Sequence, residues 1–504
     1  MSDGLRRLVV RAVGANSIGA GLAKIISLCS TLLLARLLTP EDFGLMAMAS
    51  TVTGLIGFFN EIGLGAAIVQ RKQVSKEELN GCFAISVLAS GFLCLLVIAI
   101  SWPVADFFNM PALQRLLAVL GFGFFFGALN TVPVALLRRE LLFQTVLWLG
   151  VCCALIQSAV TIPLAALGFG YWSIVGGFFV GQTFATLWFW RVNSWRPTWP
   201  LKPSGGRTLL GYGVEITFTR VLWHVYMNAD KLIVGKLLGE RAVGIYDVSR
   251  SIASLPTSQI SGLVTSIASP VFARVQQDLP KLQAVQLRLT RGVAYLTFPL
   301  LAGIAILAAE LVQVLLGSKW SEAVLPMQAL CISEAVATIA NLQAQLLIST
   351  GRARQLVRYN LMCAFVMPLS LAIGGWQFGL QGIGIAWALV YPLLASWLLR
   401  DALRASGLGI KQFWQGVRQP MAGSAVMVLA VYGARQLMQP LQIPALALLA
   451  TCAAVGVFVY AAYVLLIDKE GLQEIRQVLA DFGVPERLLS RWPFSLAPMA
   501  QNNI

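Results

Sequence analysis

Apolar residues occur along this chain in solid blocks of about 20 residues, separated by short segments rich in Arg, Lys, Gly and Pro. A helix rises about 1.5 Å per residue, so such a block can cross roughly 30 Å of hydrocarbon. Lipid offers no hydrogen-bond partners, so a spanning segment must be helical or belong to a closed barrel, whose strands would alternate apolar and polar residues. The solid blocks therefore predict an all-α polytopic membrane protein. Its about 14 transmembrane helices are expected at residues 16–37, 44–68, 81–102, 112–136, 144–167, 170–190, 212–237, 244–270, 292–316, 322–349, 356–375, 378–399, 417–437 and 443–467.

The Lys and Arg residues between the blocks predict the orientation of the chain. Alternate loops carry about four times as many Lys and Arg residues as the others, and the richer set includes both chain ends. Cytoplasmic loops carry this excess, so both termini are expected in the cytoplasm and the number of spans is expected to be even. The longest polar break, 191–207, is interpreted as a cytoplasmic linker. Residues 468–504 are interpreted as a cytoplasmic tail, in which the spacing of apolar residues predicts an amphipathic helix on the inner leaflet.

Two segments 200 residues apart resemble each other without a gap. ARLLTPEDFGLMAMAS starts at Ala35 and GKLLGERAVGIYDVSR starts at Gly235, which pairs Gly44 with Gly244. A second similarity links the segments that begin at Gly168 and Gln377. Chance similarity among segments rich in Leu and Gly is the alternative. The repeat predicts two parallel six-helix lobes related by a pseudo-two-fold axis along the membrane normal, followed by two extra C-terminal helices. The expected domains are an N-lobe at 1–195, a C-lobe at 196–410, the extra helices at 411–467 and the tail at 468–504.

Composition excludes several classes of function. The 504 residues are 58% hydrophobic and 12% charged, with a net charge of +15. The positive charges lie between apolar blocks, which favours membrane topology over a nucleic-acid partner. One histidine and eight cysteines without a CxxC motif argue against a metal site or another cofactor. No glycine-rich phosphate loop with a following Lys-Ser/Thr is present, so a transporter is expected rather than an enzyme.

Charged side chains inside the apolar blocks are the candidate functional residues, because such a charge at mid-bilayer costs about 2.5–3.5 kcal/mol on insertion scales. Lys24 shares one face of the first span with small and polar residues, and Arg220 and His224 share one face of the seventh. Arg250 lies on a face of the eighth span with Tyr246 and serines. Lys24, Arg220 and Arg250, with His224, predict a cationic, hydrated cavity that binds an anion, and Arg and Lys bind phosphates well.

Other polar residues inside the blocks leave alternatives open. The candidates for a polar cavity wall or for ion coupling are Glu61, Asp230, Lys231, Glu334 and Asn341. An ion pair between Asp230 and Lys231 is the alternative for these two neighbours. Structural ion pairs between helices are the alternative for Glu61 and Glu334, and also for Lys24, Arg220 and Arg250. His224 either titrates during proton coupling or packs as a polar core residue.

Several segments resemble the polysaccharide exporters, which are the O-antigen and exopolysaccharide flippases of the MOP exporter superfamily. The resemblance covers most of residues 10–410 and is carried by ARLLTPEDFGLMAMA (35–49), ALLRRELLF (135–143), LLISTGRAR (346–354) and the stretch from Gly211 to Pro256. It implies two six-helix lobes around a V-shaped cavity. It also implies flipping of an undecaprenyl-pyrophosphate-linked oligosaccharide to the outer leaflet of the bacterial inner membrane, for surface polysaccharide biosynthesis. Related lipid flippases use Arg and Lys on spans 1, 2 and 8; Lys24 and Arg250 match this pattern, whereas span 2 offers Glu61.

Two other functions remain open at this stage. A cation-coupled multidrug exporter of the same superfamily would favour intramembrane acids, whereas these faces are mainly basic. A membrane glycosyltransferase or polymerase would usually carry large outer loops or Asp-rich soluble domains, and none is predicted. The expected partners are the lipid-linked oligosaccharide, membrane lipid, and the polysaccharide polymerase and export machinery. The energy source is open between the membrane potential, a Na⁺ or H⁺ gradient and mass action.

Overall fold

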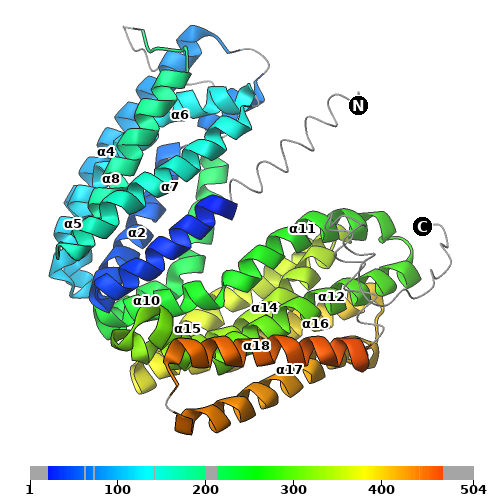
Figure 1. The fold of residues 1–504 in the computed structure, drawn as a ribbon. Coiled ribbons are helices and arrows are strands. Elements are labelled where there is room, and N and C mark those ends of the chain that lie inside the picture. Colours follow the sequence, from blue (N-terminus) through cyan, green and yellow to red (C-terminus); the bar gives the residue numbers. More distant parts are fainter. Residues whose placement is uncertain are drawn as a thin grey trace. The chain divides into compact units, whose positions relative to one another are not determined.

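The computed structural model describes residues 21–61, 64–71, 74–140, 142–198, 213–441 and 443–468. The chain is almost entirely helical over these residues, and they contain no strand (Figure 1). The structure divides into two compact units, which are treated separately below. Unit 1 takes the described residues up to Val248, with Leu315–Glu322 and Gly375–Leu380. Unit 2 takes Ser249–Val314, Ala323–Gly374 and the described residues from Gln381 onward.

Unit 1 is a bundle of long helices. It contains a helix over residues 21–37, then α2 (Pro40–Glu61), α3 (Leu64–Gln70), α4 (Lys76–Phe108), α5 (Pro111–Gly121), α6 (Gly123–Arg139), α7 (Phe143–Ala166), α8 (Trp172–Val192) and most of α10 (Gly213–Ala253). Local signals define their ends. A capping box of Ser75 and Glu78 starts α4, Asn109 in the left-handed region ends it, and Pro111 occupies the first turn of α5.

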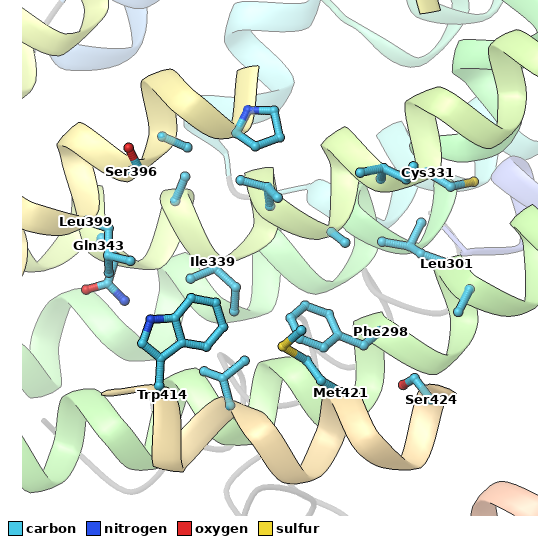
Figure 2. Close-up of a pocket in the computed structure, with 18 of the residues that line it drawn as sticks. Phe298, Leu301, Cys331, Ile339, Gln343, Ser396, Leu399, Trp414, Met421 and Ser424 are labelled. Atoms are coloured by element: carbon cyan, nitrogen blue, oxygen red, sulfur yellow. The ribbon is translucent and has the colours of Figure 1, made fainter. Parts of the chain in front are cut away.

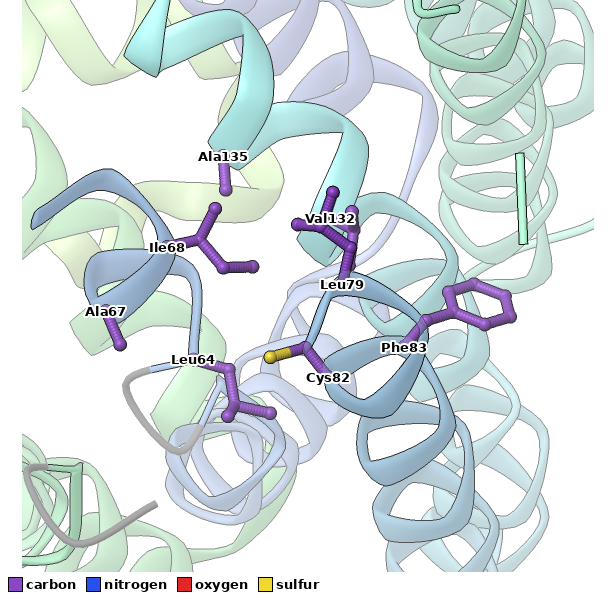
Figure 3. Close-up of a cluster of buried hydrophobic side chains, with 8 residues drawn as sticks. All are labelled: Leu64, Ala67, Ile68, Leu79, Cys82, Phe83, Val132 and Ala135. Atoms are coloured by element: carbon purple, nitrogen blue, oxygen red, sulfur yellow. The ribbon is translucent and has the colours of Figure 1, made fainter. Parts of the chain in front are cut away.

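The packing of unit 1 is visible where α3, α4 and α6 meet (Figure 3). Leu64 and Ile68 of α3 lie against Leu79 and Cys82 of α4, and Val132 of α6 completes the buried cluster. These side chains occur at helical spacing within apolar blocks, so the sequence pattern that predicts membrane spans also supplies the core. Close helix packing fixes the backbone that carries the polar residues described below.

Unit 2 contains the second set of helices. They are α11 (Leu255–Val275), α12 (Leu279–Ile306), α13 (Ala308–Leu311), η2 (Val312–Leu316), α14 (Val324–Ser349), α15 (Ala353–Ile385), η4 (Ala386–Val390), α16 (Tyr391–Ser406), α17 (Ile410–Met438), η5 (Gln439–Leu441) and α18 (Ala445–Leu466). Leu315 and Leu316 of η2 and Gly375–Leu380 of α15 belong to unit 1. The residues of η3 (Ser318–Ala323) also fall in unit 1, except for Ala323. Helix α15 is interrupted at Gly379, whose φ of +59° favours glycine, so this element contains one expected span, 356–375, and the beginning of the next, 378–399.

The predicted spans agree with the helices. The described part of every expected span is helical over almost all of its length. Among the described residues, nine helices are long and apolar enough to cross a membrane, and one of them, Ala353–Ser406, is 54 residues long. The all-α polytopic fold is therefore confirmed, whereas the count of 14 crossings and the division into six, six and two spans stay predictions. Most of the predicted linker, from residue 199 to 207, and the tail from 469 to 504 lie outside the described residues.

The two repeat segments contact each other reciprocally in unit 1. A Cβ atom on Gly44 would lie 1.8 Å from the carbonyl oxygen of Glu240, and one on Gly244 would lie 1.8 Å from that of Pro40. At the repeat offset of 200 residues, Gly44 corresponds to Gly244 and Pro40 corresponds to Glu240. The second contact is therefore the first contact with the two repeat segments exchanged. A two-fold axis produces this reciprocity. The structure thus gives Gly44 and Gly244 equivalent surroundings, as the repeat predicts.

Candidate functional site

Lys24 lies on the helix over residues 21–37 of unit 1, and its side chain is exposed. The buried residues of this helix are near its end, where Leu34 packs with Leu38 and Ala165. Thr31, seven residues after Lys24 and so on the same face of the helix, donates to the carbonyl oxygen of Ser27 at 2.9 Å. The helix is therefore anchored at one end, and Lys24 lies away from that anchor.

His224 on α10 is packed against α2. Its Nε2 lies 3.0 Å from the carbonyl oxygen of Thr51, and its ring meets Phe58 edge to face at 5.3 Å between centroids. A Cβ atom on Gly54 would lie 3.0 Å from the imidazole Cε1, so glycine at this position makes room for the ring. These contacts favour the packed interpretation of His224, while its participation in anion binding stays a prediction.

Asp230 and Lys231 have partners on the far limb of α10. This element reverses at Gly239, whose φ is +81°. Lys231 Nζ forms an ion pair with Asp247 Oδ1 at 2.6 Å. The hydroxyl of Tyr246 donates to Asp230 Oδ2 at 2.6 Å. The ion pair of Lys231 thus joins the two limbs of α10, rather than resting on its sequence neighbour alone.

A polar seam joins α11 and α14 in unit 2, and Arg250 lies beside it. Thr338 of α14 donates to Thr257 Oγ1 of α11 at 3.4 Å, and Glu334 of α14 interacts electrostatically with Arg250. The half-buried Arg250 guanidinium carbon lies 5.7 Å from the centroid of the Trp387 ring, which is a cation–π geometry. Asn341 Nδ2 donates to Ser261 Oγ at 3.4 Å. Arg250, Glu334 and Asn341 therefore lie close to one polar seam of this unit, while their roles in a substrate cavity stay predictions.

Two predicted site residues are described only in part. Glu61 is the last residue of α2 and Arg220 lies within the first limb of α10. Their side chains lie outside the described part of the structure. Their roles stay predictions from the sequence.

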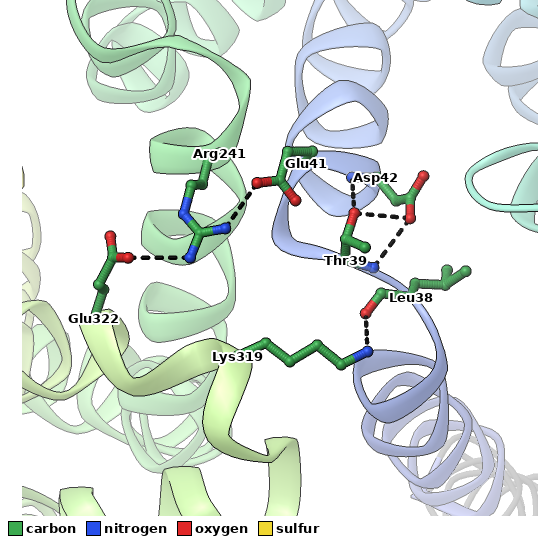
Figure 4. A network of polar contacts seen from close by, with 7 residues as sticks. All are labelled: Leu38, Thr39, Glu41, Asp42, Arg241, Lys319 and Glu322. Carbon is green, nitrogen blue, oxygen red and sulfur yellow. Dashed lines mark hydrogen bonds and ion pairs between the residues drawn. The ribbon is translucent and has the colours of Figure 1, made fainter.

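Sequence reasoning missed a network of charges in unit 1 between the predicted spans (Figure 4). Arg241 contacts Glu41 at 2.8 Å and Glu322 at 3.0 Å, and Lys319 Nζ donates to the carbonyl oxygen of Leu38 at 2.9 Å. Burial raises the pKa of the Glu240 carboxyl above its usual value, and the charges of Glu41 and Asp42 raise it further. The ion pair between Glu41 and Arg241 could have been suspected from the repeat, because its offset of 200 residues places these two positions in correspondence.

The sequence resembles known proteins of polysaccharide biosynthesis. The sequence pattern of a family described as "Polysaccharide biosynthesis protein" matches residues 33–325. The lipopolysaccharide biosynthesis protein WzxC of Escherichia coli is 24% identical over 367 residues, which are 72% of this chain and 75% of WzxC. The teichuronic acid biosynthesis protein TuaB of Bacillus subtilis is 23% identical over 389 residues, covering 74% and 78% of the two chains.

The fold resembles solved structures of MOP superfamily proteins. The inward closed conformation of the lipid II flippase MurJ superposes with a TM-score of 0.72 at 14% identity, covering 90% of this chain and 99% of MurJ. An inward-facing multidrug transporter of the MATE family gives a TM-score of 0.59 at 16% identity, covering 79% and 98%. At these identities the superpositions show the fold alone, and this fold confirms the multi-pass membrane protein that the apolar blocks predict.

Proposed function

Because the chain belongs to the polysaccharide biosynthesis protein family, we propose that it is a flippase for an undecaprenyl-pyrophosphate-linked oligosaccharide. It would move this lipid from the inner to the outer leaflet by alternating access, to supply surface polysaccharide biosynthesis. The observation that carries the proposal is the family match over residues 33–325, a stretch that includes Arg250. The MurJ-like fold adds support, since MurJ is a lipid II flippase.

The chemistry around Arg250 suits the proposed substrate. A pyrophosphate is a dense anion, and a guanidinium can bind it through two parallel hydrogen bonds. Arg250 is half-buried, so water screens its charge less than it would at a fully exposed site. Thr257, Ser261 and Asn341 on the polar seam offer groups that can exchange hydrogen bonds with sugar hydroxyls. The prediction that Lys24 and Arg220 also bind the anion belongs to this proposal.

The location and partners follow from the same proposal. A lipid-linked precursor made in the cytoplasm has to cross the bacterial inner membrane, so the protein would reside there with both termini in the cytoplasm. Its product would pass to the polysaccharide polymerase and export machinery on the outer side. The excess of Lys and Arg in alternate loops supports this orientation.

Deletion of the gene tests the function directly. In a strain without related genes, lipid-linked repeat units should accumulate on the cytoplasmic leaflet and surface polysaccharide should disappear. Wild-type protein should restore export, whereas Arg250→Ala should not, although it reaches the membrane at the normal level. Arg274→Ala, which removes an exposed arginine from α11, is the matched control and should restore export. Normal surface polysaccharide in the deletion strain would refute the proposal.

A multidrug exporter is the second candidate, favoured by the superposition on the MATE transporter. Such a protein would use an intramembrane acid such as Glu334 to bind a cationic drug. In unit 2, however, Glu334 already interacts with Arg250, which reduces its attraction for a cation. Drug sensitivity of the deletion strain with unchanged surface polysaccharide would favour the exporter over the flippase.

A further inference from the structure

Unit 2 contains an apolar groove that the proposed function does not use (Figure 2). Its volume is about 500 Å³, which is within the range of small-molecule sites, about 300–1,000 Å³. It lies among α12, α14, α16 and α17, and Gln343, Ser396 and Ser424 are among its few polar lining residues. Several lining side chains, including Ile332, Trp414 and Met421, are also exposed, so the groove is open at the surface of this unit.

The groove and the polar seam use opposite faces of α14. Ala335, Ile339 and Gln343 line the groove. Glu334 and Asn341 belong to the seam. At about 100° per residue, the two sets are centred on opposite sides of the helix. The groove is therefore a site separate from Arg250, and its apolar lining selects a hydrocarbon ligand.

Basic side chains gather at one end of the groove. Figure 2 shows Trp414, Ser396 and Gln343 at this end, with Cys331 and Leu301 toward the other end. Lys411 and Arg418 lie one turn before and one turn after Trp414 on α17. Arg400 and Arg404 follow Ser396 on α16. All four basic side chains are exposed, and Asp401 is the only acid in residues 391–424.

The length of the groove matches one leaflet. Trp414 and Ser424 line it ten residues apart on α17, a rise of about 15 Å, which is half of a hydrocarbon core of about 30 Å. Trp397 and Trp414 are 56% and 51% exposed at the basic end. Exposed indoles are enriched where the membrane meets water. The basic end thus suits the headgroup level, with the groove extending into the acyl region.

We propose that this groove binds one acyl chain of an anionic glycerophospholipid, whose headgroup phosphate lies on a basic rim formed by Arg400, Lys411 and Arg418. The rim complements a negative headgroup, and such clusters at the edge of helical pockets favour anionic lipids. The apolar walls hold a chain of any lipid, so the groove supplies affinity and the rim supplies headgroup selectivity. This inference does not depend on the proposed function.

The test measures retained lipid on the full-length protein. The protein is purified from nanodiscs that contain equal amounts of phosphatidylglycerol and phosphatidylcholine, and co-purified lipids are quantified by mass spectrometry. Wild type should retain phosphatidylglycerol at least fivefold over phosphatidylcholine. The triple variant Arg400→Gln, Lys411→Gln, Arg418→Gln should retain both lipids equally. Ala335→Phe, which fills the groove, should retain several-fold less of either lipid, and Ser396→Phe at the exposed rim serves if Ala335→Phe does not fold.

A matched control separates the rim from general basic charge. The triple variant Arg352→Gln, Arg354→Gln, Arg358→Gln removes three exposed arginines from residues that do not line the groove, and it should keep the wild-type preference. An equal loss of phosphatidylglycerol in this control would overturn the proposal. Equal retention of both lipids by wild type would also overturn it. So would a polyprenyl lipid as the molecule retained, or a dimer of the protein that covers the groove and retains no lipid.

Discussion

The crossing of Gly44 and Gly244 in unit 1 should not tolerate a methyl group. In either position a Cβ atom would lie 1.8 Å from a carbonyl oxygen, whereas a carbon and an oxygen normally approach to about 3.3–3.6 Å. Because the obstructing atoms belong to the backbone, the helices must separate by more than 1 Å, on the order of the difference between these distances. Overpacking typically costs about 1–3 kcal/mol, and Gly→Ala within a helix returns up to about 1 kcal/mol. We expect each of Gly44→Ala and Gly244→Ala to destabilise the protein by about 1–2 kcal/mol.

The assay is thermal unfolding of the purified protein in detergent, followed by size-exclusion chromatography after heating. Because the two contacts are equivalent, the two single variants should unfold at similar temperatures below that of wild type. The double variant should lose less than the sum, since the first methyl already separates the helices that the second would push apart. Gly433→Ala is the control, because no atom lies within 4 Å of its added Cβ. If Gly44→Ala and Gly244→Ala unfold at or above the wild-type temperature, as the control should, the close crossing is refuted.

Three further predictions concern charged side chains. Lys231→Met should destabilise by about 1–3 kcal/mol, because it leaves Asp247 unpaired, and adding Asp247→Asn should recover part of the loss in a denaturation experiment. Glu240→Gln should raise the unfolding temperature slightly at pH 7 but not at pH 4, because it removes a carboxylate whose ionised form the fold disfavours. The raised pKa of Glu240 in the fold means that its contribution to stability is present at low pH and is lost as the pH rises through that pKa. Glu334→Gln should tighten binding of pyrophosphate to the purified protein and slow polysaccharide export, because it removes the charge that competes for Arg250.

The sequence predicted the helices because membrane insertion imposes a simple rule, one apolar block for each crossing. It also predicted the equivalence of Gly44 and Gly244, because an ungapped repeat preserves which residues face the local two-fold axis. The interruption of α15 at Gly379 was predicted to within a few residues, because one expected span ends at residue 375 and the next begins at residue 378.

The partners of the charged residues were less predictable than their helical faces. A periodicity of 3.6 residues places Lys231 on a face but does not identify the helix beside it. The partner could have been found from the hairpin, because Lys231 and Asp247 are equidistant from Gly239, as Asp230 and Tyr246 nearly are. His224 gave no such signal, because its contact with the carbonyl oxygen of Thr51 depends on how α10 packs against α2.

The surroundings of Arg250 suit a site that has to release its ligand. An isolated guanidinium of low hydration would bind a pyrophosphate strongly. A transporter that binds its substrate too strongly releases it slowly. The same limit applies to a channel, where an ion must bind weakly enough to leave the pore. In unit 2 Arg250 faces the Trp387 ring and interacts electrostatically with Glu334. An arriving anion must therefore compete with Glu334, which lowers its net gain on binding. The same acid reduces the cost of keeping Arg250 inside the membrane when no anion is bound. We therefore propose that Glu334 sets the strength of the anion site rather than acting as the binding site for a coupling cation.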